Sequence, residues 1–431
     1  MYLKQILKVI ELNRSLKYPE GVQRLFRRNT MTITAKEISD FVDTHKDEAI
    51  QFLQEIIQTP SVTGDEEAVS FVFERWMKQS GLEVRRIEAK PHRPNLFAEW
   101  FGSQKGKRFV FNGHMDVFPP DNRDPGFYGP WSGKIVDGYL YGRGACDMKG
   151  GDACAMMCVL FLRKMGFDPK GSVALTWMCD EENGGALGVQ YILKNYPELL
   201  TGDFGICPEP SDGILYPKQC GILRGTITYI GNPGHTALLY DGETCIQKAT
   251  KAIQELYKLN DELTSRPVAD NVPPPHLTIA LINGGTAANV YPSKVTFWFD
   301  RRLIPGETHD QALKEITDRL DTLKAQDPSY EYDLVVTSRR PILDIPYNDP
   351  FIELAKRSYK EIMGKDVRVA VCPGGSDAAW IYKVTKTPMP HYGGAEEFSD
   401  WAMAKPNERI SLNAYFNFIK VYMMTVVNAL S

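Results

Sequence analysis

The sequence predicts an α/β fold in which a larger domain with a largely parallel sheet is interrupted by a small α+β domain of ferredoxin-like order. Two patterns predict it. From about residue 36 to residue 215, and again after about residue 338, helix-like segments alternate with apolar segments of strand length, which indicates a sheet covered by helices. Between residues 216 and 338 the order strand, helix, strand, strand, helix, strand is that of a ferredoxin-like unit. A chain of 431 residues is long enough for both domains.

Residues 1–30 are predicted to form a helical extension. The segment MYLKQILKVI places Leu3, Ile6, Leu7 and Ile10 on one helical face. Charges interrupt it, so it has neither the apolar core nor the cleavage site of a signal peptide. The sequence also lacks an apolar stretch of the roughly 18 residues that span a bilayer. We therefore expect a cytoplasmic protein without membrane contact.

The first part of the larger domain is predicted over residues 31–215. Apolar residues with helical spacing occupy residues 35–58, 66–81, 149–166 and 184–197. Apolar runs of strand length occupy residues 95–102, 107–118, 171–182 and 203–210. This alternation is the reason for expecting parallel strands.

The small domain is predicted over residues 216–338. Its strands are expected at residues 221–232, 276–285, 294–305 and 330–336, and its helices at residues 243–261 and 308–326. The larger domain then resumes over residues 339–431. It is predicted to contain a helix at 349–364, apolar segments at 366–377 and 387–394, and a final helix from Leu412.

The charge balance and the cysteines exclude some classes of function. There are 50 Lys and Arg residues against 54 Asp and Glu residues, with no basic run, so nucleic acid is not an expected partner. The eight cysteines form no C-x-x-C pair, which argues against a thiolate zinc cluster and indicates reduced residues in a cytoplasmic protein.

Polar residues follow the predicted strands at four places. His114 and Asp116 in FNGHMDV lie near the end of the predicted strand at 107–118, where open α/β sheets bind ligands. Asp116 could accept a hydrogen bond from the second ring nitrogen of a metal-bound His114. The alternative for this motif is a capped strand end with a satisfied histidine. Asp147 lies in the glycine-rich loop GRGACDMKGG, where it could instead cap the following helix.

Two further acidic motifs lie at strand ends. Glu181 and Glu182 in WMCDEENGG can take different tasks, one as a metal ligand and one as a proton carrier, although a charged turn is the alternative. Glu209 in DFGICPEP also follows a short apolar run. Together these motifs offer nitrogen and carboxylate ligands without thiolates, which suits two divalent ions: zinc, or alternatively manganese or cobalt.

The series GHMDV, GRGACDMKGG, DEENGG and CPEPS resembles the family of co-catalytic di-zinc amidohydrolases and peptidases. That family includes aminoacylase, acetylornithine deacetylase, succinyl-diaminopimelate desuccinylase, carnosinase and glutamate carboxypeptidase. The likeness runs from about residue 36 to the C-terminus. It implies that residues 31–215 and 339–431 form a catalytic domain, and that residues 216–338 form a lid or dimerisation domain.

The resemblance also implies roles for the motif residues. Four of them would be metal ligands: His114 and Glu209 on the first ion, Glu182 on the second, and Asp147 between the two. Asp116 would orient His114. Glu181 would be the general base, which takes a proton from the bridging water and delivers it to the leaving nitrogen.

The predicted small domain and the loop after residue 373 carry a second set of residues implied by the resemblance. His235 in GNPGHTA would reach the active site of a partner subunit and stabilise the developing oxyanion, which requires a homodimer; a turn histidine is the alternative. Asn289 would contact substrate. Arg302 would pair with a substrate carboxylate or form a structural ion pair. PGGSDAAW resembles a substrate-binding loop with Gly375 and Ser376.

The chain departs from the family pattern at the last metal ligand. The family has a histidine after a glycine-rich turn, whereas this chain has HYGGAEEFSDW. Glu396 aligns best with that histidine and is our first prediction for the ligand, with Asp400 and Trp401 behind it. His391 is the alternative, and Glu397 or no ligand is a third.

The substrate loop departs as well, because Ala378, Ala379 and Trp380 follow the Ser-Asp pair where desuccinylase-like members carry an arginine. This argues mildly against a dicarboxylate substrate. The leading hypothesis is therefore a metal-dependent hydrolase that cleaves the amide bond of a small N-acyl amino acid. The alternatives are a dipeptidase or carboxypeptidase of the same family, or an inert relative that binds metal or ligand.

Overall fold

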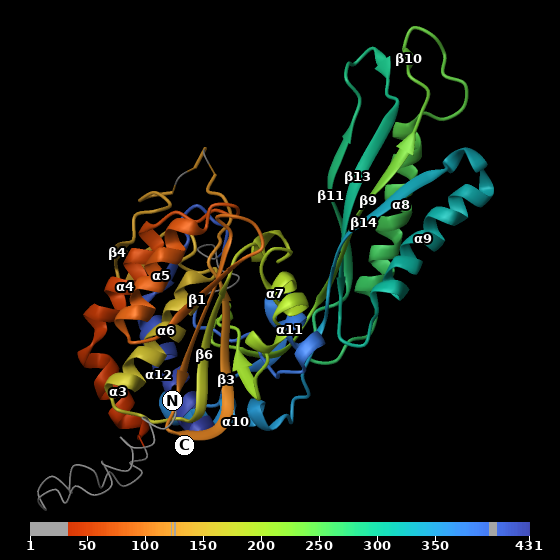
Figure 1. Ribbon diagram of the computed structural model, residues 1–431. Helices are drawn as coiled ribbons and strands as arrows, with labels where there is room; N and C mark the ends of the chain where they lie inside the picture. Colours follow the sequence, from red (N-terminus) through yellow and green to blue (C-terminus); the bar gives the residue numbers. More distant parts are fainter. Residues whose placement is uncertain (1–32, 122, 125, 396–402) are drawn as a thin grey trace, which may run out of the picture. The chain divides into compact units, whose positions relative to one another are not determined.

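The computed structural model describes residues 33–121, 123–124, 126–395 and 403–431 (Figure 1). By its internal contacts the chain divides into residues 1–34 and one compact unit, Ala35–Ser431. The predicted extension over residues 1–30 lies outside the described residues. The boundaries predicted within the compact unit, at residues 215 and 338, stay predictions.

The central sheet has five strands in the order β1-β2-β6-β3-β7. These are β1 (Val84–Glu88), β2 (Pro94–Phe101), β6 (Lys170–Met178), β3 (Gln104–His114) and β7 (Phe204–Ile206). β3 runs parallel to β6 and β7, whereas β1 and β2 are antiparallel to their neighbours. The prediction of a largely parallel sheet is therefore wrong, and the sheet is mixed. Only Gly102 and Ser103 join β2 to β3, and so short a connection reverses the chain direction.

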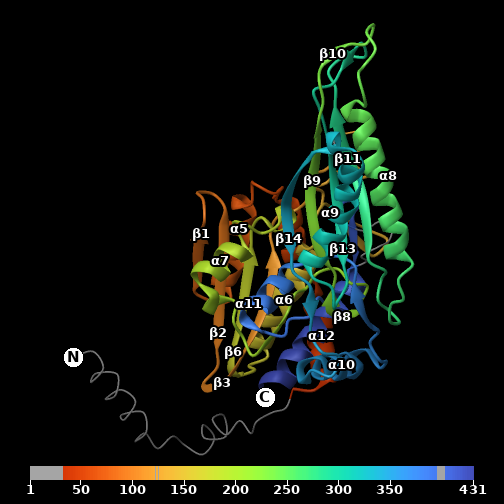
Figure 2. The same ribbon diagram turned by 90° about the vertical axis from the view of Figure 1, so that its right-hand side faces the viewer.

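Helices lie on both sides of this sheet (Figures 1 and 2). One side carries α3 (Ala35–Thr44), α4 (Lys46–Gln58), α5 (Glu67–Gln79), α6 (Lys149–Lys164), α10 (Pro350–Met363) and α12 (Leu412–Leu430). The other side carries α7 (Val189–Asn195) and α11 (Asp377–Thr385). The helix predicted over residues 35–58 is two helices, α3 and α4, which are separated at His45.

Helix α6 is buried along residues 149–162, as expected of a helix that is apolar on all sides. It also approaches the segment after β7 very closely. A Cβ atom at Gly151 would lie 1.7 Å from the carbonyl oxygen of Pro208. Glycine at this position therefore allows the loop that carries Asp147 and the segment that carries Glu209 to meet.

Short elements complete this part of the chain. One three-stranded sheet has the order β17-β5-β4, with β17 (Arg409–Ser411), β5 (Tyr139–Tyr141) and β4 (Lys134–Val136). Another has the order β15-β8-β16, with β15 (Leu343–Asp344), β8 (Leu215–Gln219) and β16 (Val369–Cys372). Single 3-10 turns are η1 (Glu181–Asn183), η2 (Pro197–Leu199) and η3 (Pro328–Tyr330).

Residues 221–340 contain a separate antiparallel sheet in the order β11-β13-β9-β14. Its strands are β9 (Gly221–Ile230), β11 (His276–Gly284), β13 (Lys294–Leu303) and β14 (Tyr332–Arg340), and its helices are α8 (Cys245–Thr264) and α9 (His309–Gln326). The elements follow each other in the predicted ferredoxin-like order. Alternate residues of β13 are buried against the helices, which gives this sheet its own core with Phe297, Phe299 and Leu256.

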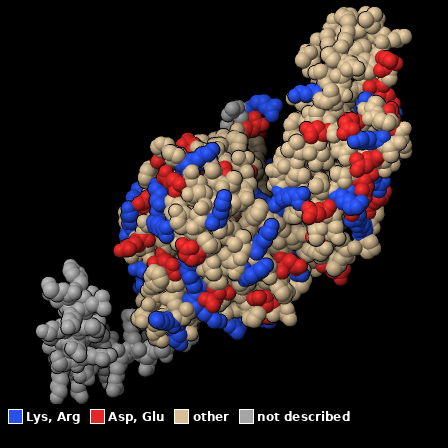
Figure 3. Space-filling model, turned by 45° about the vertical axis from the view of Figure 1, so that its right-hand side comes forward, with Lys and Arg blue, Asp and Glu red and all other residues tan. Residues whose placement is uncertain are grey.

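Two very short strands, β10 (Gly234–His235) and β12 (Val290–Tyr291), pair at one end of the four-stranded sheet (Figure 1). On the face shown in Figure 3, basic and acidic residues are interspersed over most of the surface, but the end of the sheet that carries β10 is almost free of charge. Within the described residues, no helix is long and apolar enough to cross a membrane.

Candidate metal centre and active site

His114 is the last residue of β3, next to Met178 at the end of the parallel strand β6. Its side chain is 1% exposed, and Nε2 faces three carboxylates. Nε2 lies 3.4 Å from Asp147 Oδ1, 3.7 Å from Glu209 Oε1 and 4.0 Å from Glu181 Oε2. Burial alone would lower the pKa of His114, but the hydrogen bond to Asp147 and the charges of Glu209 and Glu181 raise it well above its ordinary value.

Asp116 fixes both His114 and the turn that carries Glu181. The main-chain carbonyl of Asp116 pairs with Nδ1 of His114 at 2.9 Å, while its carboxylate Oδ1 lies 3.6 Å from that nitrogen. The carboxylate accepts the main-chain N–H groups of Glu181 at 3.0 Å and Glu182 at 3.2 Å, and the hydroxyl of Thr63 at 2.9 Å. Asp116 therefore orients the imidazole mainly through its backbone, and its side chain holds η1.

Asp147 is held by a buried acid that the sequence pattern did not reveal. Glu408 Oε1 accepts the main-chain N–H groups of Cys146 and Asp147, each at 3.0 Å. Glu408 Oε2 accepts a hydrogen bond from Arg143 Nη1 at 2.7 Å, and both side chains are almost fully buried. Arg143 and Glu408 are 265 residues apart in sequence, so neither residue has a local signal for this pairing.

A second arginine, the largely buried Arg93, holds the start of the acidic turn. Arg93 donates to both carboxylate oxygens of Glu66, at 2.6 and 2.8 Å, and to Asp180 Oδ1 at 3.0 Å. Asp180 has a left-handed backbone, with φ of 69°. Its carboxylate also accepts the N–H of Leu187 at 3.0 Å. These bonds turn the chain sharply after β6, and the main chain of Glu181 and Glu182 then lies beside Asp116, just after the end of β3.

The acidic side chains meet at one point. One ligand atom each from His114, Asp147 and Glu209 lies within 4.8 Å of the others, and all three residues are buried. Burial raises the pKa of Glu209 well above its ordinary value, and the charges of Asp147 and Glu181 raise it further. The pKa of Glu182 is raised well above its ordinary value for the same reasons: burial first, then the charge of Asp147. Mutual repulsion among the carboxylates thus raises their pKa values, as expected where carboxylates are placed together to bind cations.

The residues fit a pair of divalent cations. Within the described residues, Glu182 Oε1 and His391 Nδ1 are buried and have no hydrogen-bond partner. A cation would satisfy such atoms. The donors are imidazole nitrogen and carboxylate oxygen, which suit zinc, manganese or cobalt.

His391 belongs to the same region. Its ring is buried, its Nε2 pairs with the carbonyl oxygen of Pro210 at 2.7 Å, and the charge of Asp147 acts on it. Burial lowers the pKa of His391 to about 4, so the ring is neutral and Nδ1 carries a lone pair when Nε2 donates. The first prediction for the last ligand, Glu396, lies outside the described residues, as do Glu397, Asp400 and Trp401.

The predicted substrate loop adjoins Glu181. Gly375 accepts a hydrogen bond from Arg340 Nη1 at 2.8 Å through its carbonyl, and Arg340 also pairs with the carboxylate of Glu181. Ser376 is fully buried: its hydroxyl donates to Gln219 Oε1 at 2.8 Å, and its carbonyl accepts from Gln219 Nε2 at 3.2 Å. The hydroxyl of Ser376 thus fixes the loop, and the carbonyl of Gly375 contacts the arginine that pairs with Glu181.

His235 and Asn289 lie together but apart from this cluster. Asn289 Nδ2 is 3.4 Å from His235 Nε2, and Asn289 accepts the N–H of Thr236 at 3.0 Å. Both side chains are exposed at the end of the four-stranded sheet, where Figure 1 places β10. Arg302 lies elsewhere on that sheet, where its Nε donates to Asp300 at 2.8 Å. These three residues share no contact with His114 in the described part of the chain.

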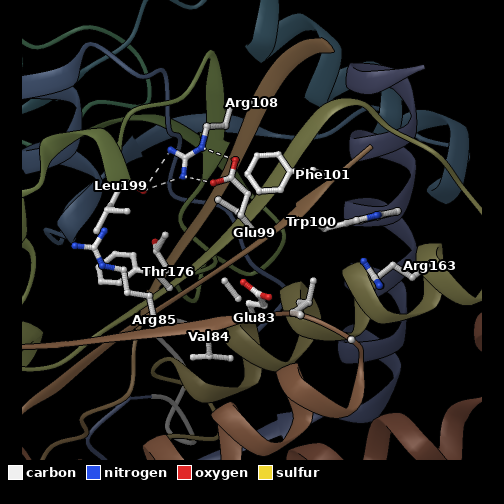
Figure 4. A pocket seen from close by; sticks show the side chains of 15 residues that line it. Glu83, Val84, Arg85, Glu99, Trp100, Phe101, Arg108, Arg163, Thr176 and Leu199 are labelled. Atoms are coloured by element: carbon white, nitrogen blue, oxygen red, sulfur yellow. Dashed lines mark hydrogen bonds and ion pairs between the residues drawn. The ribbon is translucent and has the colours of Figure 1, made fainter. Parts of the chain in front are cut away.

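A separate hollow of about 510 Å³ lies over β1, β2, β6 and β3 (Figure 4). Its lining includes Arg85, Glu99, Trp100, Phe101 and Arg108, but none of the predicted site residues. Glu99 is already paired with Arg108 through two hydrogen bonds, at 2.9 and 3.0 Å. The charges of Glu99 and Arg108 thus neutralise each other, whereas the carboxylates of the acidic cluster repel each other.

Comparisons with known sequences identify relatives along most of the chain. The family model described as Peptidase family M20/M25/M40 matches residues 110–428. A succinyl-diaminopimelate desuccinylase of Methylorubrum extorquens is 31% identical over 345 residues, covering 76% of this chain and 86% of the relative. A protein of the same description from a Bradyrhizobium species is 28% identical over 388 residues, covering 87% of this chain and 97% of the relative.

Solved structures share the fold. The dipeptidase Dug1p of Saccharomyces cerevisiae has a TM-score of 0.77 at 15% identity, with 93% of this chain and 99% of that chain covered. Human carnosine dipeptidase 1 has a TM-score of 0.75 at 17% identity, with 92% and 98% covered. Bacillus subtilis YxeP, described as a dinuclear metal binding peptidase, has a TM-score of 0.65 at 17% identity, with 90% and 99% covered.

Proposed function

Since the chain belongs to Peptidase family M20/M25/M40, we propose that it hydrolyses the amide bond of a small N-acyl amino acid. Family membership confirms the prediction of a metal-dependent hydrolase that acts on amide bonds. The observation that carries the proposal is the convergence of His114, Asp147 and Glu209 within 4.8 Å, with Glu181 beside them.

We propose that two zinc ions are held by the acidic cluster. His114 and Glu209 would bind one ion, Glu182 the other, and Asp147 both, as the resemblance implies. Either Glu396 or His391 would complete the second set, and the buried Nδ1 of His391 supports the latter. When bound, such ions polarise a carbonyl group and lower the pKa of water.

Glu181 is the proposed general base. Its Oε2 lies on the His114 side of the site, within reach of a water molecule there. The carboxylate would take a proton from that water and return it to the leaving nitrogen. Asp116 supports this role, because it holds the N–H group of Glu181 and thereby the position of the side chain.

Substitution of Glu181 tests the chemistry. We expect Glu181→Gln to retain the metal content of the wild type and to lose activity by about 100-fold or more, since general-base catalysis contributes roughly 10²–10⁴-fold. Glu353→Gln, at a surface ion pair with Lys356, is the matched control and should match the wild type. Full activity of Glu181→Gln on every amide tried would eliminate the proposed base.

The acyl group is addressed by a substrate panel. The desuccinylase relatives support a deacylase, while Ala378, Ala379 and Trp380 after Ser376 favour an apolar acyl group over a dicarboxylate. N-acetyl, N-benzoyl and N-succinyl amino acids and dipeptides would be compared by kcat/KM. Cleavage restricted to dipeptides with a free amine would replace the deacylase proposal with the dipeptidase alternative.

We also propose that residues 216–338 act as a lid and as the surface of a homodimer. β11 is an edge strand with exposed Leu281 and Ile282, and the end of the sheet exposes Leu238 and Leu239. The low charge of this end in Figure 3 supports an apolar contact. Sedimentation showing a fully active monomer would contradict it.

His235 would serve the partner's active site, with Asn289 and Arg302 on the substrate. A mixing experiment tests this. Glu181→Gln and His235→Ala subunits, each inactive alone, should regain roughly a quarter of wild-type activity when reassociated at random, because half of the dimers are mixed and each has one intact site. No recovery in verified mixed dimers would contradict a role in trans.

We propose a cytoplasmic location. The eight cysteines are all buried thiols, which suits a reducing compartment. Cell fractionation that placed the protein in an oxidising compartment would overturn this.

A further inference from the structure

Arg340 is a buried arginine that reaches the proposed general base from the four-stranded sheet. It is the last residue of β14 and pairs with Ile222 of β9. Its carbonyl oxygen is 2.9 Å from Nε2 of His309, which further fixes its backbone. The arginine is therefore anchored in one sheet while its guanidinium lies against a turn of another part of the chain.

The guanidinium joins two loops. Nη1 donates to Oε1 of Glu181 and, at 2.8 Å, to the carbonyl oxygen of Gly375. Nη2 donates to the carbonyl oxygen of Glu181 at 3.0 Å. Both the side chain and the backbone of Glu181 are thus held by one rigid, planar group, whereas an ammonium at this position would hold Glu181 by a single contact.

The surroundings favour a permanent charge at this point. The Arg340 side chain is 10% exposed. Burial alone would lower the pKa of Arg340, but the charges of Glu181, Asp377 and Glu209 raise it above its ordinary value. Arg340 therefore remains a cation, surrounded by acids of the active site.

Gly375 makes room for this arrangement. A Cβ atom at Gly375 would lie 2.7 Å from Arg340 Cδ and 3.3 Å from Ile222 Cδ1. Any larger residue would displace the arginine stem. The substrate loop and the arginine therefore fit each other, and the loop position depends on the arginine.

We propose that Arg340 is a positioning residue, which holds Oε1 of Glu181 so that Oε2 points to the His114 side of the site. The inference rests on the proposed function of Glu181 as base. With Oε1 held by the guanidinium, the rotation of the carboxylate is restricted, and Oε2 remains 4.0 Å from His114 Nε2. The arginine also connects the end of β14 to the base, so that a displacement of the four-stranded sheet at this point would reach Glu181.

Two substitutions test the proposal in the metal-loaded protein. Arg340→Met keeps the length of the side chain and removes the charge, and we expect kcat to fall about 100-fold with KM within about 3-fold, as for a misplaced catalytic group. Arg340→Lys restores the charge with one contact and should recover kcat to within about 10-fold of the wild type. Arg339→Met is the matched control, because Arg339 pairs with exposed Asp310, and it should match the wild type.

Several results would overturn the inference. An increase in KM with unchanged kcat for Arg340→Met would mean that the arginine contacts substrate instead. A loss of metal content would mean that it maintains the centre rather than the base. Unchanged kinetics, or no recovery in Arg340→Lys, would remove the positioning role.

A third variant guards against misfolding of Arg340→Met. Gly375→Ala leaves the charge of Arg340 in place but displaces the stem of its side chain. We expect kcat to fall about 10-fold, with a smaller change in KM. Unchanged kinetics would overturn the inference. The control for the proposed function is Glu181→Gln. If Glu181→Gln is inactive while Arg340→Met and Gly375→Ala are fully active, the positioning role fails and the base remains. If Glu181→Gln is active, the base itself fails.

Discussion

The buried ion pair between Arg143 and Glu408 predicts that one substitution weakens both folding and metal binding. Glu408 accepts three hydrogen bonds, from Arg143 and from the main-chain N–H groups of Cys146 and Asp147. The side chains of Arg143 and Glu408 are 4% and 1% exposed. Glu408→Gln keeps the shape of the side chain but leaves the arginine without a charged partner.

The expected loss of stability follows from this burial. Removal of one partner of a buried ion pair costs about 3–5 kcal/mol, because the other charge stays buried and uncompensated. Burial raises the pKa of Glu408 to about 7, so its carboxylate is itself costly to bury near neutral pH. Losing that cost offsets part of the effect, and we expect a decrease of about 3 kcal/mol in the free energy of unfolding of the metal-free protein.

Urea denaturation in the presence of a chelator measures this quantity. Asp318→Asn is the control, since Asp318 pairs with Lys314 on the exposed surface of α9 and should change the free energy by less than about 0.5 kcal/mol. The double variant Arg143→Met/Glu408→Gln removes both charges. It should be more stable than Glu408→Gln alone.

The same variant tests the link to the metal centre. Because Glu408 holds the main-chain N–H of Asp147, its loss should weaken metal affinity about 10–100-fold, as for other residues that support a ligand. Calorimetric titration with zinc measures it. If the free energy of unfolding decreases by less than about 1 kcal/mol and the metal affinity is unchanged, the reasoning is refuted.

Three further predictions concern cations, pH and packing. Burial and neighbouring charges raise the pKa values of Glu182 and Glu209, so metal binding should release protons. The heat of binding should then depend on the ionisation enthalpy of the buffer, and equal heats of binding in different buffers would contradict this. Burial alone would raise the pKa of Glu99, but its partner Arg108 on β3 brings the pKa below its ordinary value. The carboxylate therefore stabilises the fold above about pH 4.5, and this stabilisation is lost as the pH falls through the lowered pKa. The difference in urea midpoint between the wild type and Glu99→Gln should therefore shrink in acid, and a constant difference would exclude this. Gly151→Ala should cost about 1–3 kcal/mol of stability through its close approach to a carbonyl oxygen, and an unchanged melting temperature would argue against that clash.

The sequence predicted that the candidate ligands converge, because the strands before them are parallel. His114 is the last residue of β3, Glu182 follows β6 and Glu209 follows β7, and these three strands form the parallel part of the sheet. The carboxyl ends of parallel strands meet at one edge. The mixed character of the rest of the sheet arises from β1 and β2, whose direction depends on short connections and not on apolar periodicity.

The residues that hold the candidate ligands in place were not predictable in the same way. Arg340 is 159 residues from Glu181, and Arg143 is 265 residues from Glu408. An arginine or a glutamate in a loop or at the end of a strand has no periodicity and no motif of its own. The sequence pattern locates a ligand by the strand before it, but a supporting charge is recognised only when the fold brings its partner close.

The acids of this region fall into two groups with different charge compensation. One group is paired with arginine: Glu66 and Asp180 with Arg93, Glu408 with Arg143, and Glu181 with Arg340. The other group forms no ion pair with lysine or arginine in the described part of the chain: it includes the predicted metal ligands Asp147, Glu182 and Glu209, together with the buried Asp116, Asp152 and Asp377. Buried carboxylates without a compensating charge bind protons, unless a cation takes the place of the proton. The arginines therefore neutralise four acids around the site, including the proposed base Glu181, and leave uncompensated the three that the family pattern assigns to metal. This division explains how so many acids can be gathered at one sheet edge while the charge of two divalent ions is still required there.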